Sequence, residues 1–258
     1  MRARMSFLLL LAVMLFLPAA AEPPAAPPAA PPPYMPLSGP PLHYAIEETT
    51  NTELPGVGPV QTVDRLQQVS AFRAATKEEM AEVGAGPAQL VVDISRRDGV
   101  GTDPAQEILT YMSASAEGIL VHAVKGPDGR LEKYMPPLRH LPRDPAAGAT
   151  WEMGTIRQQG LLFPTTGSVI GLERVTTMAG VFDSCLHVRF TVEKVGGEAA
   201  ADGTSMHVKQ GTSRIDDWYA PGVGLVREEA TSSITVESSG QSTTLSIRQI
   251  QELKKAPS

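Results

Sequence analysis

The sequence predicts an all-β, mainly antiparallel fold: a curved meander sheet that forms an open half-barrel or a barrel, with little helix. Residues 42–258 alternate short stretches rich in Val, Ile, Thr and Ser with Gly, Pro and Asp turn residues. Successive stretches follow one another closely, which favours hairpins over long crossovers. A sheet of roughly eight to eleven such strands curls rather than staying flat.

The first 21 residues have the three-part plan of a secretory signal peptide. Arg2 and Arg4 precede an apolar run of about 14 residues, and small residues end it at Ala21. A retained anchor is the disfavoured alternative, because about 20 apolar residues are needed to span a membrane. No Cys follows the small residues for lipid attachment. We therefore expect an exported protein, in the periplasm or extracellular, without a transmembrane segment after cleavage.

Residues 22–41 are mostly Pro and Ala and predict an extended linker. Proline has a fixed φ and no backbone N–H, so this stretch cannot join a helix or the interior of a sheet. A passive tether is favoured over a docking site for a proline-reading domain. Residues 42–258 then form a single β domain, long enough to bury a core.

Charge and cysteine content exclude several classes of protein. The formal net charge is −6 and the acidic residues are scattered, so no nucleic acid is expected as a partner. Cys185 is the single cysteine, which forbids an intrachain disulfide. Aromatic residues make up only 5% of the chain, so the core must be mainly aliphatic.

The first half of the domain is predicted to consist of strands around one ambiguous segment. Leu42 to Asn51 predicts the first strand. Val60 to Phe72 has some helical spacing, but its neighbours favour a strand. Ala75 to Gly86 predicts one helical turn or a polar loop, and Ala88 to Gly101 a strand. Glu107 to Pro137 predicts two or three strands, with a tight hairpin at the Gly-Pro-Asp-Gly-Arg turn.

The second half begins with an irregular crossing segment, Pro136 to Trp151, because its four prolines oppose regular structure. Leu186 to Val192 alternates apolar and polar residues, as a strand with one buried face does. Gly196 to Gly203 predicts a loop. The last strands are predicted over 204–220, 224–238 and 242–253.

Three elements occur in a fixed order: Gly-x-x-Trp ending at Trp151, Ala-Gly-x-Phe-x-x-Cys ending at Cys185, and Trp-Tyr-Ala-Pro-Gly-Val-Gly-Leu-Val over Trp218 to Val226. In these the chain resembles a broad group of exported bacterial proteins of unknown function. The resemblance covers Gly148 to the C-terminus, and the first half only in layout. It implies a half-barrel similar in outline to periplasmic lipoprotein carriers. The group brings no activity, so no catalytic residue is transferred.

The Gly-Val-Gly of the third element predicts a structural turn rather than a phosphate loop. A phosphate loop needs a helix after its glycines, whereas a strand-like stretch follows here. Pro221 presets φ, and Gly222 and Gly224 take conformations closed to other residues. Trp218 and Tyr219 then point to opposite faces, one packed on the core and the other capping it.

Two sets of residues have side-chain types that could support catalysis. Cys185 and His187 share a strand face with Asp183, which permits a nucleophile and base. A rigid strand rarely presents a nucleophile, however, and a small buried hydrophobe is the favoured interpretation of the cysteine. Asp216 and Asp217 are adjacent and therefore face opposite ways, which makes them a poor acid–base pair.

Motifs for metals and hydrolysis are missing from the sequence. Neither His-Glu-x-x-His nor Gly-x-Ser-x-Gly occurs. Gly101 to Glu107 lacks the alternating oxygens of a calcium loop, and Asp103 is predicted to open a turn before Pro104. No catalytic, cofactor-binding or metal site and no cofactor is predicted. The histidines are scattered: His43, His122, His140, His187 and His207.

The sequence therefore predicts a non-enzymatic binding module. Its ligand would be apolar or amphipathic, such as a lipid or lipoprotein tail, or else a cell-envelope partner, bound on the concave face of the sheet. One alternative is a structural or assembly factor of the envelope that adds a partner strand at an open edge. Another is a hydrolase acting on envelope material, which would need polar residues with perturbed pKa values in a cleft.

Overall fold

A computed structural model describes residues 34–54, 56, 58–85, 89–98, 105–158, 161–193, 197–201, 204–238 and 241–255. The predicted signal peptide, most of the predicted linker, and Asp103 and Pro104 lie outside these residues. The described part contains one helix and thirteen strands: β1 Leu42–Leu54, β2 Gly58–Ala74, α1 Lys77–Val83, β3 Val91–Arg97, β4 Gln106–Ser115, β5 Gly118–Lys125, β6 Leu131–Pro142, β7 Thr150–Gln158, β8 Leu161–Thr177, β9 Gly180–Glu193, β10 Gly197–Ala201, β11 Thr204–Ala220, β12 Gly224–Ser238 and β13 Gln241–Leu253.

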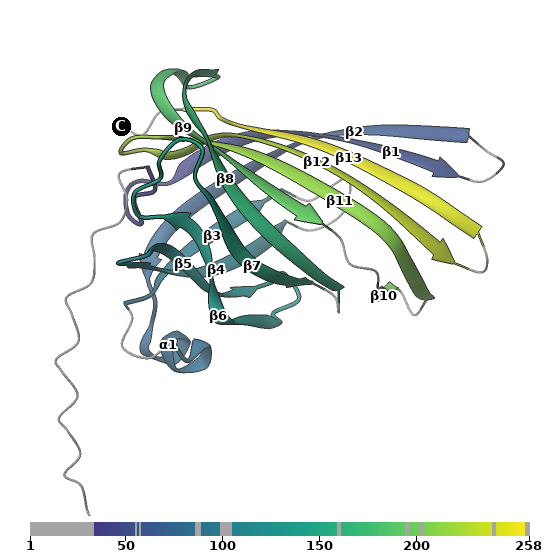
Figure 1. Cartoon of the computed structure of the whole chain (residues 1–258), viewed down its shortest axis with the longest axis horizontal. Coiled ribbons are helices and arrows are strands. Elements are labelled where there is room, and N and C mark those ends of the chain that lie inside the picture. Colours follow the sequence, from purple (N-terminus) through teal and green to yellow (C-terminus); the bar gives the residue numbers. More distant parts are fainter. Residues whose placement is uncertain are drawn as a thin grey trace, which may run out of the picture.

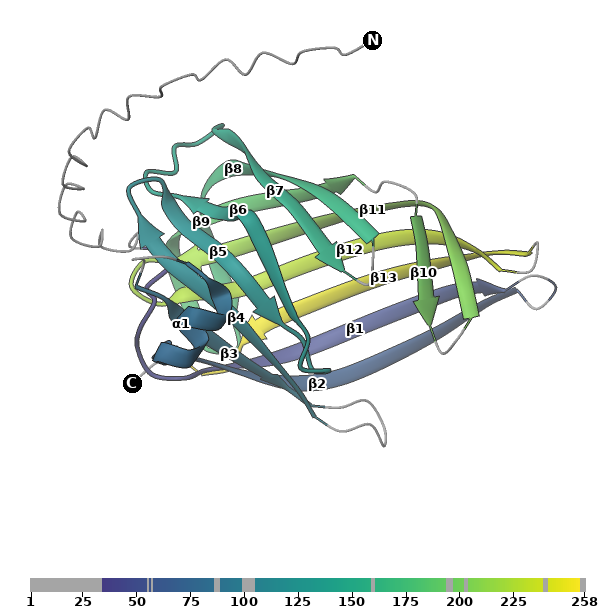
Figure 2. The ribbon, with the colours of Figure 1, turned by 90° about the horizontal axis from the view of Figure 1, so that it is seen from below.

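All the strands belong to one antiparallel sheet, with the order β6-β5-β4-β3-β2-β1-β13-β12-β11-β9-β8-β7 and β10 paired to β11. Chain neighbours pair almost throughout, and β1 pairs β13 to join the two halves. The sheet is rolled, so that β3–β6 lie across from the long strands (Figure 1, Figure 2). These long strands, β1, β2 and β11–β13, extend beyond the shorter ones. The predicted fold class is confirmed: an antiparallel, nearly closed barrel with one short helix.

The two ends of the strand order, β6 and β7, meet along a seam. Trp151 on β7 donates its indole N–H to the main-chain oxygen of Arg139 on β6, at 2.8 Å. The indole ring lies against Gly167 on β8, where a Cβ would come within 2.2 Å of it. Side chains therefore close the roll at this point.

The main core lies inside the roll. It is largely aliphatic, as predicted, with Tyr134, Trp151, Phe190 and Tyr219 added. Residues 34–41, which precede β1, also touch it: Leu37 is buried in the same cluster. The end of the predicted linker thus packs on the β domain.

Two predictions about irregular segments are wrong. Pro136 to Trp151 is predicted to be irregular, but β6 extends to Pro142 and β7 begins at Thr150, so only residues 143–149 of this segment lie outside strands. The pairing of β5 with β6 jumps from Val121↔Leu138 to Ala123↔Lys133, so the Pro136–Pro137 pair lies in a bulge on an edge strand, where missing N–H groups cost little. The predicted loop Gly196 to Gly203 also contains a strand, β10.

The ambiguous segments of the first half resolve clearly. Val60 to Phe72 lies in strand β2, as favoured. The helical alternative holds for Ala75 to Gly86, because α1 has a complete capping box. Thr76 accepts a hydrogen bond from the N–H of Glu79, and the Glu79 carboxylate accepts one from the N–H of Thr76.

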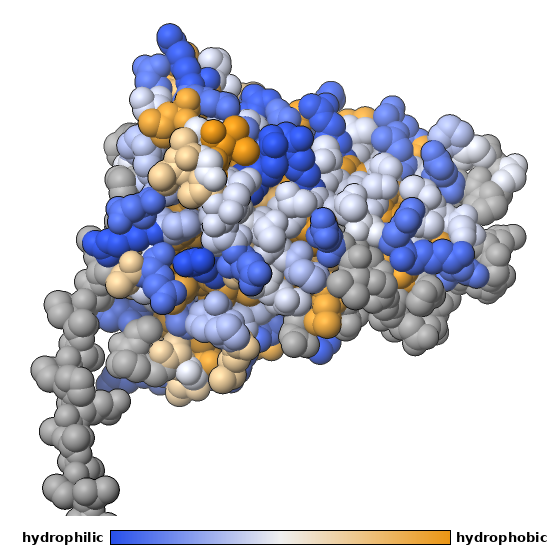
Figure 3. Space-filling view, in the orientation of Figure 1, coloured by the Kyte–Doolittle hydropathy of each residue, from blue (hydrophilic) through white to orange (hydrophobic). Residues whose placement is uncertain are grey.

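The face drawn in Figure 3 is mostly polar, as a Ser- and Thr-rich sheet surface should be. Hydrophobic side chains gather on it over the β8–β9 hairpin. Exposed apolar residues near the turn of that hairpin include Ile170, Leu172, Met178 and Val181.

Candidate functional site

Two adjoining cavities lie inside the roll. The inner cavity has a volume of about 220 Å³ and the outer one about 620 Å³. They share the lining residues Thr110, Val121 and His140, so the two cavities adjoin there. The outer volume falls within the about 300–1,000 Å³ typical of small-molecule sites. Its apolar lining comprises Ile108, Val121, Val124, Tyr134, Leu138, Met153 and Ile156.

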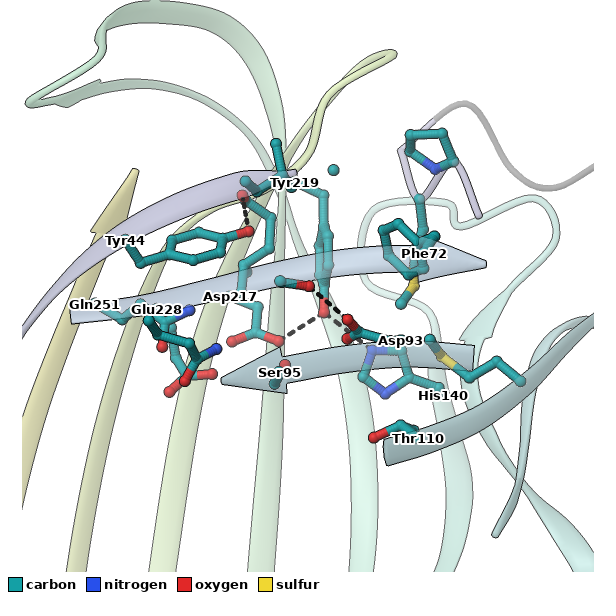
Figure 4. Close-up of a pocket in the computed structure, with 18 of the residues that line it drawn as sticks. Tyr44, Phe72, Asp93, Ser95, Thr110, His140, Asp217, Tyr219, Glu228 and Gln251 are labelled. Carbon is teal, nitrogen blue, oxygen red and sulfur yellow. Dashed lines mark hydrogen bonds between the residues drawn. The ribbon is translucent and has the colours of Figure 1, made fainter. Parts of the chain in front are cut away.

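The inner cavity brings several acidic side chains together. Strands from both halves of the roll line it, and their side chains converge from opposite directions (Figure 4). Three of the lining residues are acidic: Asp93 on β3, Asp217 on β11 and Glu228 on β12. None of the described residues that line it is Lys or Arg.

Two of these acids face each other across one hairpin. The β11–β12 register pairs Asp217 directly with Glu228. A β-bulge lies between Trp218 and Tyr219, next to this pair. Like charges at directly opposed positions destabilise a sheet, so this arrangement opposes folding when both groups are ionised.

A hydrogen-bonded chain connects Asp217 with the outer cavity. Tyr219 donates its hydroxyl proton to Oδ2 of Asp217 at 2.6 Å. His140 Nε2 lies 3.1 Å from the same hydroxyl. Because the tyrosine proton is committed to Asp217, His140 must be the donor in this contact, which defines the Nε2–H tautomer. Oδ1 of Asp217 is buried and has no partner among the described residues.

The pKa values of the three acids are raised. Burial, followed by the neighbouring charge of Glu228, raises the pKa of Asp217 well above its usual value. Burial also raises the pKa of Glu228, although Gln249 and Arg97 oppose the shift. The same cause raises the pKa of Asp93 against the hydrogen bond from Ser70. Burial lowers the pKa of His140 to about 4, so its imidazole is neutral near neutral pH.

Part of the acid cluster has protein partners. Ser70 donates to Asp93 at 2.5 Å, and Gln249 donates to Glu228 at 2.9 Å. Arg97 is the nearby cation, but its two terminal nitrogens donate to Glu48 and Gln249. The cluster therefore lacks a cation bonded directly to any of its three carboxyl groups among the described contacts.

The opposite face of the same strands carries a second polar network, around Asp216. Asp216 Oδ1 lies 2.8 Å from both His187 Nε2 and Arg189 Nε, and Oδ2 lies 2.6 Å from Arg214 Nε. Burial works to raise the pKa of Asp216, but these three partners outweigh it and the pKa is lowered. Asp216 and Asp217 thus face opposite ways, as predicted.

The residues of the predicted turn lie together at one end of this hairpin. β11 ends at Ala220 and β12 begins at Gly224, with positive φ of 71° at Gly222 and 104° at Gly224. The chain turns at Pro221 on the way. Tyr219 is buried in the core, while Trp218 stacks on His187 on the outer face, with ring centroids 4.4 Å apart.

Cys185 and His187 do not form a catalytic pair. Cys185 is fully buried, and its Sγ donates to the main-chain oxygen of Phe182 at 3.6 Å. Burial raises the pKa of its thiol. His187 contacts Glu173 and Asp216 instead, and Asp183 is exposed beside Arg174. The interpretation of Cys185 as a small buried hydrophobe is confirmed.

The histidines remain dispersed in the fold. His122 bonds to Ser113 at 2.8 Å, while His140 belongs to the cavity chain and His187 to the outer network. The side chain of His207 lies outside the described part, and His43 is on β1. Within the described part of the chain, no three His, Cys, Asp or Glu side chains come together as a metal site would require.

Sequence reasoning missed Asp93, His140, Asp217 and Glu228 as a set. A signal for one pair was available, because the stretch from Asp216 to Glu229 begins with two aspartates and ends with two glutamates. A hairpin centred on the predicted turn places one acidic pair opposite the other. Asp93 and His140 come from the other half of the roll, which no local pattern reveals.

Comparisons with known proteins give similarity in fold outline only. No protein-family model and no curated protein matches the chain. A candidate lipoprotein from Parabacteroides distasonis is 12% identical, with 86% of this chain and 97% of that chain covered and a TM-score of 0.36. A candidate exported protein with a YmcC-like fold from Bacteroides fragilis is 13% identical, with 82% and 94% covered and a TM-score of 0.33. A DUF1329 family protein from Desulfovibrio piger is 10% identical, with 82% and 85% covered and a TM-score of 0.22.

These TM-scores are too low to carry an argument. The chain is similar to these bacterial proteins in fold outline, and the resemblance based on the elements ending at Trp151, Cys185 and Val226 stays a prediction. Among the described residues, no helix has the length and apolar character needed to cross a membrane.

Proposed function

We propose that this chain is an exported, non-enzymatic binding protein that holds an apolar or amphipathic ligand inside its rolled sheet. The observation that carries the proposal is the outer cavity of about 620 Å³, where Ile108, Val121, Val124, Leu138, Met153 and Ile156 line the space beside the charged side chains of Asp128, Arg130 and Glu132. Burial of apolar ligand surface there would supply the main driving force for binding. The predicted signal peptide supports export.

Displacement of a neutral fluorescent dye such as phenylnaphthylamine from the full-length protein tests this function. Val124 lines the outer cavity, so Val124→Trp should fill part of it and weaken dye binding about tenfold or more, a factor easily resolved in a titration. Ile156→Trp, on another strand of the same lining, provides a second cavity-filling variant. Val63→Trp is the matched control, because Val63 is an exposed valine of β2 that lines neither cavity.

Native mass spectrometry of the exported chain, purified from its own envelope with lipid extraction alongside, addresses the ligand itself. A bound acyl chain or lipid is the expected result. Absence of dye binding, or equal binding by Val124→Trp, Ile156→Trp and Val63→Trp, would contradict a ligand site in the roll.

A hydrolase remains the second candidate function, favoured by one observation. Asp217 and Glu228 are opposed carboxyl groups with raised pKa values in a cavity, and a general acid needs a raised pKa. Turnover of ester or glycoside substrates that is lost in Asp217→Asn would favour this candidate over the binding protein.

A further inference from the structure

The inner cavity has an excess of acidic side chains, of which Asp217 is buried. Its described lining includes Asp93, Asp217 and Glu228 but neither Lys nor Arg. The groups that face Asp217 from the surrounding strands are neutral or acidic: Tyr44, Asp93, His140, Tyr219 and Glu228. Buried charges in proteins are normally paired, so this end of the space lacks a partner.

Among the three acids, Asp217 shows most directly where a hydrogen-bond partner is missing. The residue is only 4% exposed, and Tyr219 satisfies its Oδ2. Its Oδ1 has no hydrogen-bond partner among the described residues. The carboxyl group lines the cavity and points into it (Figure 4). Buried polar atoms are almost always hydrogen-bonded, so an N–H or O–H group inside the cavity would complete the site.

We propose, on the basis of the proposed function above, that the ligand carries a cationic amine and that Asp217 receives this amine in the inner cavity. An ammonium group supplies both the donor that Oδ1 lacks and the positive charge that the three acids lack. The apolar part of the same ligand extends past His140 into the outer cavity, which shares that residue with the inner one. A carboxylate headgroup in the same position would face the acid cluster and be repelled.

Binding of this ligand changes the protonation of the site. Burial raises the pKa of Asp217 in the empty cavity, and an ammonium group against Oδ1 favours the ionised carboxyl group. Where the empty site still holds the proton, the O–H bond of the acid breaks, the proton leaves to solvent, and an N–H···O contact forms with the carboxylate. Affinity for the amine therefore rises with pH until Asp217 is ionised in the empty protein as well.

Three ligands of equal chain length test the inference on the full-length protein: octylamine, octanol and octanoate, each used to displace the neutral dye. At about pH 8, octylamine is an ammonium ion and octanoate a carboxylate. Octylamine should bind about tenfold more tightly than octanol, since a hydrogen bond to a charged group is worth at least that factor. Octanoate should bind most weakly.

Asp217→Asn should remove the preference for octylamine and leave octanol binding unchanged. Asp183→Asn is the matched control, because Asp183 is exposed and lines neither cavity. Calorimetry over a pH series, in two buffers of different ionisation enthalpy, provides a readout that needs no variant: octylamine should release a proton on binding at pH values below the pKa of Asp217 in the empty protein, and octanol should release none.

The outcomes separate the two proposals. Equal binding of all three compounds, or preference for octanoate, overturns the amine inference while a ligand site in the roll stands. A preference for octylamine that survives in Asp217→Asn also overturns the assignment to Asp217. Failure of every compound, and of the dye, overturns the proposed function itself.

Discussion

Asp217 and Glu228 occupy directly opposed positions on β11 and β12, with both side chains turned into the inner cavity. Antiparallel strands rarely place two like charges in this way, because the pair is destabilising. Here burial raises the pKa of both groups, which reduces their ionisation and so relieves the repulsion. The arrangement therefore lowers the stability of the fold at neutral pH and places two acidic groups in the cavity.

Asp217→Asn is expected to stabilise the protein at neutral pH. The folded-state pKa of Asp217 lies above its unfolded value. Ionisation of Asp217 therefore costs the wild type no stability below the usual pKa of 3.8, and this cost appears as pH rises through the folded pKa. The amide does not ionise, so the gain should be near zero at low pH and grow toward pH 7. It should reach on the order of 1.4 kcal/mol for each unit of pKa elevation. Urea unfolding over this pH range measures it.

Asp183→Asn serves as the control for that experiment, because the exposed Asp183 side chain should give no pH-dependent gain. An equal gain for Asp217→Asn at low and neutral pH would mean that burial does not hold a proton on this residue.

Asp216→Asn should have the opposite effect, although the two residues are adjacent. Asp216 accepts hydrogen bonds from Arg189 and Arg214 and lies 2.8 Å from His187 Nε2. Loss of its charge should cost about 1–3 kcal/mol. Its folded-state pKa is lowered, so its contribution is present above the usual pKa of 3.8 and is lost as pH falls through the lowered value. The same urea series measures the change in unfolding free energy for both variants. Stabilisation by Asp216→Asn would contradict a stabilising role of the outer network.

Gly167→Ala should destabilise the seam between β6 and β7. A Cβ at this position would lie 2.2 Å from the Trp151 ring, and Trp151 holds the main-chain oxygen of Arg139. Displacement of the ring should cost about 1–3 kcal/mol, as overpacking usually does. Gly171→Ala, also on β8, is the matched control, because nothing lies within 4 Å of a Cβ there. Equal thermal midpoints for the two variants would rule out tight packing at the seam.

Glu79→Gln should loosen helix α1. Hydrogen bonds from Arg73, and then from the Thr76 main chain, lower the pKa of Glu79 to about 2 despite burial. This contribution is present above the usual pKa of 4.5 and is lost as pH falls toward 2. Hydrogen exchange over residues 77–83 should therefore be faster in Glu79→Gln at neutral pH, with the difference shrinking in acid. Glu78→Gln, in the same helical turn, is the control and should change the exchange rate little. Thr76→Ala removes the N-cap side chain and should cost about 1 kcal/mol of stability.

Local patterns predicted most of the fold and little of the cavity. The hairpins followed from turn residues such as Gly222 and Gly224, and the rolled meander followed from many short neighbouring strands. Strand β6 was missed because its prolines are tolerated only on an edge and at a bulge, and edge position depends on the whole sheet. The register of the β11–β12 hairpin could have predicted that Asp217 lies opposite Glu228. The burial of Asp217 could not be predicted, because the covering residues Asp93 and His140 come from the distant half of the chain.

The short segment before β1 has a consequence for how the site would respond to force. Met35 and Pro36 line the inner cavity, and Leu37 next to them is buried in the core. This part of the cavity wall therefore comes from a stretch that belongs to no strand. Tension applied to the chain ahead of residue 34 would reach the cavity wall before it reached the sheet.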